Sequence, residues 1–466
     1  MSFEEFKLVT PRFIPPLEPE FRPAVLANRA FQEAVAADGV PLVIGLERDR
    51  QQVSRFEMRV FPDGHSQTAA NFRFVERLVK FLLWQRGGYK VYIGGPRRVG
   101  EFIRQYYSPQ GPGAFDYHFM GEQVYEHTFT VGSCDPSEVP PAFEIGQALG
   151  RHLDGCRIGF DLGASDRKVS AVVDGQVVYS EEVVWEPRKQ TDPDYHYREI
   201  ITALKTAASK MPRVDAIGGS SAGIYIDNRP MVASLFRGIP QERFHEIRNL
   251  FLRIRDEMGV PLEVINDGDV TALAGSMSLE DTGILGIAMG SSEAAGFVDL
   301  NGHILGWLSE LAFAPIDYSP QAPLDEWSGD AGVGSQYFSQ QCVFRLASRA
   351  GIQIPAGLTD AERLKFVQEK LEDGHEGATK IWQSMGVYLG YGLAHYADFY
   401  EARHVLLLGR CTSGRGGSLI LEGANAVLQA EFPELAARLH IQLPDEKSRR
   451  VGQSIAAASL PEIRPK

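Results

Sequence analysis

Residues 157–168 read RIGFDLGASDRK, a strand pattern that runs into a tight turn carrying a carboxylate, a glycine and a hydroxyl. Gly163 lets backbone N–H groups approach an anion, and the Ser165 hydroxyl is able to donate to a phosphate oxygen. Asp161 is suited to hold a hydrated Mg²⁺. The stretch predicts a phosphate-binding β-hairpin, and the alternative is a hairpin whose aspartate and glycine serve turn geometry alone.

The elements that follow this hairpin recur later in the chain. Three strands are predicted, then a helix at 195–210 and a strand at 214–221, and the same order starts again at 283. The second round ends with a strand at 404–410 and a helix at 418–432. This weak repeat, without obvious residue identity between its halves, predicts two similar α/β lobes with a central cleft, where ligands bind.

The second round opens with three predicted strands, at 283–290, 294–302 and 303–308.

The region before residue 150 predicts an extra N-terminal α/β domain of unknown role. Strands at 41–49 and 54–61 precede an amphipathic helix at 71–85. Three prolines interrupt the periodicity between 133 and 146, which predicts a boundary there. The expected domains are residues 1–150, a first lobe at 151–278 and a second lobe at 279–466.

Composition excludes several classes of partner. The 466 residues carry a formal net charge of −13, so no global positive field attracts nucleic acid or anionic lipid. The acidic, proline-rich N-terminus lacks a secretory pattern, and no apolar run approaches a membrane span. The four cysteines have no paired short spacing and predict free thiols. We expect a cytoplasmic protein that binds neither nucleic acid nor membranes.

A second candidate site lies at 263–269, EVINDGD, where a strand ends and a helix begins. A carboxylate at the carboxyl end of a strand is well placed to accept a proton from a substrate hydroxyl, which makes Asp267 the candidate base. The alternative is that Asn266, Asp267 or Asp269 caps the following helix. Both roles are able to coexist.

Two further turns carry small residues. The stretch 288–296 offers Gly290 and Ser291 between two strands, where a second phosphate turn is expected, and the stretch 407–414 opens at Gly409 from a strand into a helix. Each turn has an ordinary structural interpretation, because glycine and serine are common turn and cap residues. Their order along the chain is the informative feature.

From Arg157 to Ala458 the chain resembles the ROK family of sugar kinases and repressors, within the actin-like ATPase superfamily. The residues that match the first phosphate motif, the segment of the catalytic aspartate and the adenosine turn are Asp161, Gly163, Ser165, Asn266, Asp267 and Gly409. The resemblance implies two actin-like (RNase H-like) lobes, ATP and Mg²⁺ as cofactors, and a homodimer. It also implies that Asp267 is the catalytic base and that Asp161 positions Mg²⁺ through water.

Several family motifs are incomplete. The glycine-rich second phosphate turn is represented only by Gly290, Ser291 and Gly296. The segment that contacts sugar and metal keeps Glu310 but lacks its histidine, and residues 315–338 replace the family's cysteine cluster. We therefore expect no structural zinc. The resemblance leaves Asn266, Asp267 and Glu310 as sugar contacts.

The leading hypothesis is ATP-dependent phosphorylation of a sugar or polyol hydroxyl, with Gly163, Ser165, Gly290 and Ser291 holding the phosphates. The first alternative is a kinase-like sensor or scaffold that has lost catalysis, because two of the nucleotide turns are eroded. The second is a transcriptional regulator of the same family. A mixed α/β N-terminal region without a basic recognition helix disfavours that alternative.

Overall fold

The computed structural model describes residues 6–146, 148–443 and 446–463. The chain forms two compact units, and each unit is assembled from separate stretches of sequence. The first unit comprises Met1–Ile145, Ile287–Ala295 and Trp307–Leu443. The second comprises Gly146–Gly286, Gly296–Gly306 and Pro444–Lys466. The N-terminal residues therefore pack with the C-terminal half of the chain.

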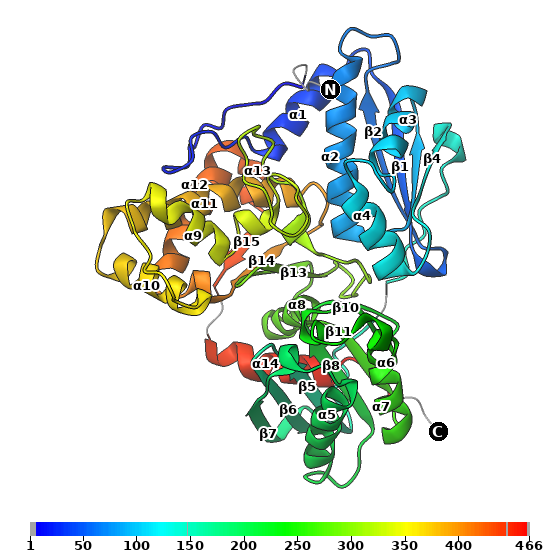
Figure 1. The fold of residues 1–466 in the computed structure, drawn as a ribbon, viewed down its shortest axis with the longest axis vertical. Helices are drawn as coiled ribbons and strands as arrows, with labels where there is room; N and C mark the ends of the chain where they lie inside the picture. The colour runs from blue at the N-terminus through cyan, green and yellow to red at the C-terminus, as the bar shows by residue number, and fades with distance from the viewer. Residues whose placement is uncertain (1–5, 147, 444–445, 464–466) are drawn as a thin grey trace. The chain divides into compact units, whose positions relative to one another are not determined.

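The second unit contains a mixed sheet in the order β11-β8-β5-β6-β7 (Figure 1). Its strands are β5 (Cys156–Leu162), β6 (Asp166–Val173), β7 (Gln176–Val184), β8 (Ala216–Ser221) and β11 (Leu262–Asn266). The first three form an antiparallel meander, while β8 and β11 run parallel to β5. These strands confirm the five that the sequence predicts here. The carboxyl ends of β5, β8 and β11 consequently meet at one edge of the sheet.

The second unit also contains a small hairpin and several helices, namely β9 (Ile224–Ile226), β10 (Arg229–Val232), α5 (Pro193–Ala208), α6 (Phe244–Arg248), α7 (Leu250–Met258), α8 (Asp267–Leu279) and α14 (Glu446–Ala458). Its core gathers apolar side chains of the sheet and of α5 and α7, including Phe160, Leu204 and Phe251. Helix α14 lies directly on the sheet, because a Cβ at Gly159 or Gly218 would fall 2.1 and 1.6 Å from its backbone carbonyl oxygens.

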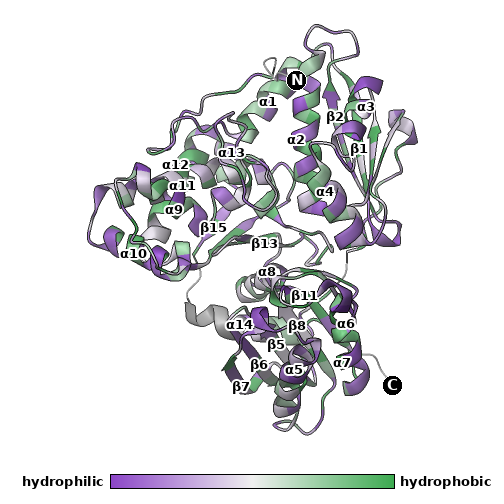
Figure 2. Ribbon diagram, viewed as in Figure 1, coloured by the Kyte–Doolittle hydropathy of each residue, from purple (hydrophilic) through white to green (hydrophobic). Residues whose placement is uncertain are grey.

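The N-terminal part of the first unit is a four-stranded sheet with helices, in the strand order β2-β1-β3-β4 (Figure 1). Its elements are α1 (Ala24–Ala34), β1 (Val40–Glu47), β2 (Val53–Val60), α2 (Thr68–Arg86), β3 (Lys90–Gly94), α3 (Arg97–Tyr106), α4 (Ala114–His118), a π-helical turn (Phe119–Tyr125) and β4 (Thr130–Cys134). Helix α2 confirms the prediction for 71–85 and is buried along most of its length. Hydrophobic and hydrophilic residues alternate along it (Figure 2).

A second sheet, in the order β13-β12-β14-β15, is accompanied by the remaining helices. These elements are β12 (Ile284–Met289), β13 (Glu293–Val298), α9 (Gln340–Arg349), α10 (Asp360–Glu372), α11 (Glu376–Tyr396), β14 (His404–Leu408), α12 (Arg415–Glu431), α13 (Pro433–Ala436) and β15 (His440–Gln442). The strand predicted at 303–308 is wrong, because only Ile304 pairs, with Val298. Gly302 and Gly306, at φ +80° and +64°, turn the chain out of an extended path.

Buried ion pairs join the N-terminal elements of the first unit to its C-terminal half. Arg77 of α2 donates to Asp330 at 3.0 Å, and Lys80 lies 2.7 Å from Asp116 and 3.4 Å from Asp330. The Tyr388 hydroxyl of α11 donates to Glu18 at 2.5 Å. The loop that carries Asp330 is thus held by α2. Among the described helices, none is long and apolar enough to cross a bilayer.

Candidate functional site

Asp161 lies near the carboxyl end of β5, in the second unit, with 14% of its side chain exposed. Its Oδ1 accepts a hydrogen bond from the Ser220 hydroxyl of β8 at 2.7 Å. Lys168 of β6 places its Nζ 3.9 Å from Asp161 Oδ2 and 3.1 Å from Asp166. Burial raises the pKa of Asp161, and the Ser220 bond and Lys168 oppose that rise. Lys168 is therefore the cation of this hairpin that faces both Asp161 and Asp166.

The turn between β5 and β6 is closed by its own hydrogen bonds. The Gly163 N–H donates to the Asp166 carbonyl at 2.9 Å, and the Ser165 hydroxyl donates to the Asp166 carboxylate at 3.0 Å. Trp185 braces the turn by donating from its indole to the Gly163 carbonyl at 2.8 Å. The Gly163 N–H is thus committed to the hairpin. The exposed Ser165 hydroxyl is able to rotate toward a ligand oxygen.

Asn266 and Asp267 stand where β11 ends and α8 begins. Asn266 is the N-cap, since its Oδ1 accepts from the Gly268 N–H at 2.7 Å and its Nδ2 donates to the Gly223 carbonyl at 2.8 Å. Asp267 is the first residue of the helix and is half-buried. Because Asn266 performs the capping, the Asp267 carboxylate is not required for it.

The electrostatics of Asp267 suit a general base. Burial, followed by the nearby Asp161 carboxylate, raises the pKa of Asp267 to about 6, against the effect of the Gly268 N–H bond. A base with a pKa just below neutrality is ionised at pH 7 and still accepts a proton readily. The structure thus brings the predicted base and the predicted metal carboxylate into electrostatic contact within one unit.

Asp269, two residues further along α8, has a different environment. Its side chain is 8% exposed and accepts a hydrogen bond from the Phe297 N–H at 3.1 Å, and burial raises its pKa to about 7. Nearby, a Cβ at Gly296 would lie 2.1 Å from the Gly268 carbonyl carbon, so the two backbones touch. Asp269 and Gly296 therefore hold α8 against the adjoining chain.

In the first unit, Gly290 and Gly409 lie on neighbouring strand ends. A Cβ at Gly409, where φ is +94°, would lie 2.4 Å from the Met289 carbonyl oxygen, so only glycine fits. The Gly290 N–H donates to the Ser292 carbonyl at 3.0 Å and forms a tight turn. This turn leaves the side chains of Ser291 and Ser292 exposed. The structure thus brings Gly290, Ser291 and Gly409 together.

The turn after β14 is already occupied by side chains of α10. Gln368 donates to the Arg410 carbonyl at 2.7 Å, and the Glu372 carboxylate accepts from the Arg415 N–H at 3.0 Å. Glu372 therefore places a negative charge at the N-terminus of α12, where an anionic ligand would otherwise find free N–H groups. The α10 contacts oppose phosphate binding at that helix end.

Glu310 belongs to the first unit, near a buried carboxyl of the second predicted phosphate turn. Its N–H donates to the Trp84 carbonyl at 2.9 Å. Burial raises the pKa of Glu293 to about 8, the Tyr396 hydroxyl at 3.2 Å opposes the rise, and the Glu310 charge adds to it. Asn266 and Asp267, the other predicted sugar contacts, lie in the second unit.

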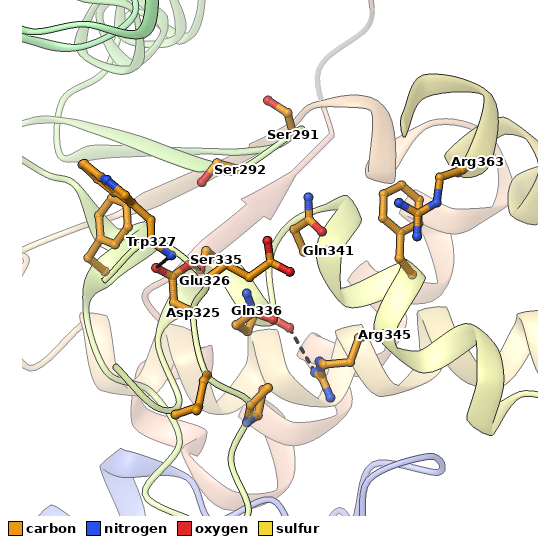
Figure 3. A pocket seen from close by; sticks show the side chains of 14 residues that line it. Ser291, Ser292, Asp325, Glu326, Trp327, Ser335, Gln336, Gln341, Arg345 and Arg363 are labelled. Atoms are coloured by element: carbon orange, nitrogen blue, oxygen red, sulfur yellow. Dashed lines mark hydrogen bonds between the residues drawn. The ribbon is translucent and has the colours of Figure 1, made fainter. Parts of the chain in front are cut away.

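Four features of the site escape sequence reasoning. Lys168 follows Asp166 at strand spacing and so shares its face of β6, which could have indicated its role. Ser220 and Glu293 become relevant only through long-range pairing. A cavity of about 570 Å³ in the first unit also has no sequence motif (Figure 3). Its walls include Ser291, Ser292, Phe313, Asp325, Glu326, Trp327, Gln336, Gln341, Phe344, Arg345 and Arg363.

The carboxylates near β5 and β11 suit a hard cation. Asp161 and Asp267 supply oxygen donors, the ligand type that Mg²⁺ prefers, and the Lys168 ammonium lies 3.9 Å from Asp161. Because Mg²⁺ usually keeps several waters, one or two protein carboxylates are sufficient. Across the described ranges, no group of three or more His, Cys, Asp or Glu side chains is arranged to hold a metal.

Comparison with solved structures identifies the class of fold. A ROK family glucokinase from Streptomyces griseus, solved with glucose and AMPPNP, is 19% identical, with a TM-score of 0.50 over 65% of this chain and 99% of that one. A ROK hexokinase from Thermus thermophilus is 17% identical, with a TM-score of 0.50 over 65% and 97%. The chain thus shares the α/β, actin-like fold of ROK sugar kinases.

A ROK family transcriptional regulator, a homologue of the E. coli MLC protein, is equally similar. It is 18% identical, with a TM-score of 0.51 over 66% of this chain and 79% of that one. No family model and no curated protein matches the sequence. The predicted resemblance is therefore confirmed at the level of the fold, which kinases and regulators share.

Proposed function

We propose that the protein transfers the terminal phosphoryl group of ATP to a hydroxyl of a sugar or polyol. The observation that carries the proposal is the half-buried Asp267 at the carboxyl end of β11, with its pKa near 6 and Asp161 beside it. Asp267 takes the hydroxyl proton, the oxygen attacks the γ-phosphorus, and the bond from phosphorus to the ADP oxygen breaks. The pKa suits this proton transfer at neutral pH.

Each remaining residue has a role within its own unit. Asp161 would hold Mg²⁺ through water, and the ion would supply charge neutralisation on the phosphates. Lys168 and Ser165 add a cation and a donor to the hairpin, alongside Gly163. Asn266 orients Asp267. The Asn266 side chain already hydrogen-bonds the Gly223 carbonyl and the Gly268 N–H, so a hydrogen bond from Asn266 to a sugar would form in addition to these two.

We also propose contacts for residues of the first unit. Gly290 and Ser291 would contact the phosphates, Gly409 the adenosine and Glu310 the sugar. A homodimer, a cytoplasmic location and the absence of nucleic-acid binding stay predictions from the sequence and its family resemblance.

The test is a transfer assay with a matched pair of variants. Purified protein is incubated with ATP–Mg²⁺ and a pool of monosaccharides, amino sugars and polyols, and products are followed by mass spectrometry for a phosphoryl gain. Asp267→Asn should lower turnover by about 10²- to 10⁴-fold, the usual contribution of a general base, while ATP binding persists. Asp269→Asn makes the same chemical change two residues away and should retain turnover. Equal turnover in both variants would remove Asp267 from the mechanism.

A second candidate function is a ligand-binding protein without catalysis. The contacts of Gln368 and Glu372 with the turn after β14 favour it, since they fill hydrogen-bonding positions that a nucleotide would use. Calorimetric titration distinguishes the two candidates. Absence of heat with millimolar ATP–Mg²⁺, together with no phosphoryl gain, supports the binding protein, and measurable affinity supports the kinase.

A further inference from the structure

The cavity of the first unit has an exposed aromatic wall. Trp327 is 53% exposed, although its ring packs edge-on against Phe119 at 5.3 Å, Phe115 at 5.2 Å and Phe313 at 5.0 Å between centroids. These contacts fix the indole while more than half of its surface remains open. An exposed, immobilised tryptophan beside a cavity is an aromatic platform that costs little entropy when a ligand binds.

The loop that carries Trp327 is held from two sides. The Asp325 carboxylate accepts hydrogen bonds from the Ser328 N–H at 2.7 Å, the Trp327 N–H at 3.2 Å and the Ser335 hydroxyl at 3.0 Å. At the other end of the loop, Asp330 is bound by Arg77 of α2. The cavity wall is therefore ordered before any ligand arrives.

Several polar side chains of the cavity are not engaged with one another. Glu326, Gln341 and Gln336 lie in the centre of the close view, below Ser291 and Ser292 (Figure 3). Within the described part of the chain, none of these five side chains makes a hydrogen bond or ion pair. They supply a carboxylate, two amides and two hydroxyls, which together are able to donate and accept hydrogen bonds.

The charges of the cavity disfavour a phosphate near the tryptophan. Arg345 is bound to Glu18 and to the Gln336 carbonyl, and Arg363 is bound to Asp360 at 3.0 Å and stacks on Phe344 at 4.0 Å. Both cations are thus partly compensated. Among the described residues, the Glu326 carboxylate next to the platform has no hydrogen-bonding or ionic partner, so it repels an anion and attracts a neutral or amino-bearing ligand.

We propose that this cavity binds a monosaccharide ring that carries no phosphate, stacked on Trp327 and hydrogen-bonded by Glu326, Gln336 and Gln341. The weakly positive C–H face of a pyranose complements the negative face of an indole, and its hydroxyls match the mixed donors and acceptors. A volume of about 570 Å³ lies within the range of small-molecule sites. The site goes beyond the proposed function, because it contains neither Asp161 nor Asp267 and shares only Ser291 with the proposed phosphate contacts.

Binding is tested by saturation-transfer NMR and tryptophan fluorescence on the full chain. The probes are glucose, mannose, galactose, glucosamine and N-acetylglucosamine, with glucose 6-phosphate as the anionic probe. At least one neutral or amino sugar should bind saturably, and glucose 6-phosphate should bind at least 10-fold more weakly than glucose. Trp327→Ala and Gln341→Ala should each lower the affinity of the cavity for the sugar at least 10-fold.

Controls separate this site from the proposed catalytic one. Phe143→Ala removes an aromatic ring that is also 51% exposed but lies outside the cavity, and it should leave binding unchanged. Asp267→Asn should also retain binding, even if it abolishes turnover. The proposal is overturned if none of the sugars binds, if Trp327→Ala leaves the number and affinity of the sugar sites unchanged, if Asp267→Asn removes all sugar binding, or if Trp327→Ala weakens the binding of ATP and leaves the binding of the sugars unaffected.

Discussion

Asp267 and Asp269 occupy the first turn of α8, and their surroundings assign them different tasks. Asp267 is partly accessible and lies beside the Asp161 charge, whereas Asp269 is buried and bonded to the Phe297 N–H. Their carboxyl groups are chemically equal, so the difference comes from position alone. Exposure separates a candidate base from a structural acid.

The pKa of Asp267 predicts the pH dependence of phosphoryl transfer. Because the base must be ionised, kcat/KM should rise between pH 5 and 7 with a midpoint near the pKa of about 6. Removing the neighbouring charge in Asp161→Asn should move the midpoint to lower pH, in whatever activity remains. A pH–rate profile measures both effects, and a profile that is flat from pH 5 to 7 would contradict the assignment.

Asp269 predicts a pH-dependent stability. Its pKa is raised from 3.8 to about 7 on folding, so the native state binds its proton more tightly than the unfolded state. This contribution is fully present below about pH 4, the unfolded value, and is lost as pH rises through 7. Asp269→Asn should therefore show a smaller fall in Tm between pH 5 and 8 than the native chain. Parallel Tm curves for the two proteins would argue against a raised pKa.

Helix α10 bears directly on the proposed nucleotide binding, because two of its side chains contact the turn after β14. If Gln368 and Glu372 block the turn after β14, the double variant Gln368→Ala/Glu372→Ala should bind ATP–Mg²⁺ more tightly, by about 3- to 30-fold for the removal of one anion and one hydrogen bond. Glu369→Ala is the matched control, since the side chain of this exposed residue of the same helix lies 3.8 Å from Lys365 and, among the described residues, makes no other ion pair. Calorimetry measures the affinities. Weaker binding in the double variant would mean that these side chains support the turn.

Sequence periodicity predicts elements well where contacts are local. The meander from β5 to β7 and the helix α2 follow from alternation and amphipathicity within short windows. The false strand at 303–308 has similar apolar content, but Gly302 closes a local turn by donating from its N–H to the Asp299 carbonyl at 3.0 Å, and both Gly302 and Gly306 adopt positive φ. The motifs at Asp161 and Asp267 can be predicted from the sequence, because each motif consists of residues that are close together along the chain.

The rest of the candidate site depends on distant residues. Ser220 reaches Asp161 from another strand, and Gln368 reaches Arg410 from another helix, so neither contact has a local pattern. The Trp327 cavity arises because a loop from the C-terminal half packs on aromatic side chains that precede residue 120. No pattern of residue spacing in the sequence predicts that these distant side chains lie in contact.

At the scale of the whole molecule, the buried charges of α2 tie the N-terminal region into the first unit. Replacing Asp330 with Asn leaves Arg77 and Lys80 without part of their compensation, which should lower the free energy of unfolding by about 3–5 kcal/mol. Glu101→Gln breaks the exposed Arg97–Glu101 pair, at 2.7 Å, and should have a much smaller effect, because water screens an exposed pair. Denaturant unfolding measures both. A similar small effect in both variants would show that the buried network contributes little.

The same network predicts sensitivity to acid. Arg77 and Lys80 hold the pKa of Asp330 below its usual range, although burial acts in the opposite direction. Its stabilising contribution is present above about pH 4, the unfolded pKa, and is lost as pH falls further. Native protein should therefore lose stability below pH 4 more steeply than Asp330→Asn, which far-UV circular dichroism during acid titration would record.

The division of each unit into three stretches of sequence has a consequence for synthesis on the ribosome. The second unit includes α14, which lies on Gly159 and Gly218, and Pro461, whose carbonyl accepts a hydrogen bond from the buried Arg157 at 2.7 Å. These partners are translated some 300 residues after β5. One apolar face of the nascent sheet therefore remains uncovered while the intervening residues are synthesised, at about 5–20 residues per second. A stop codon shortly before α14 should yield a chain that chaperones retain.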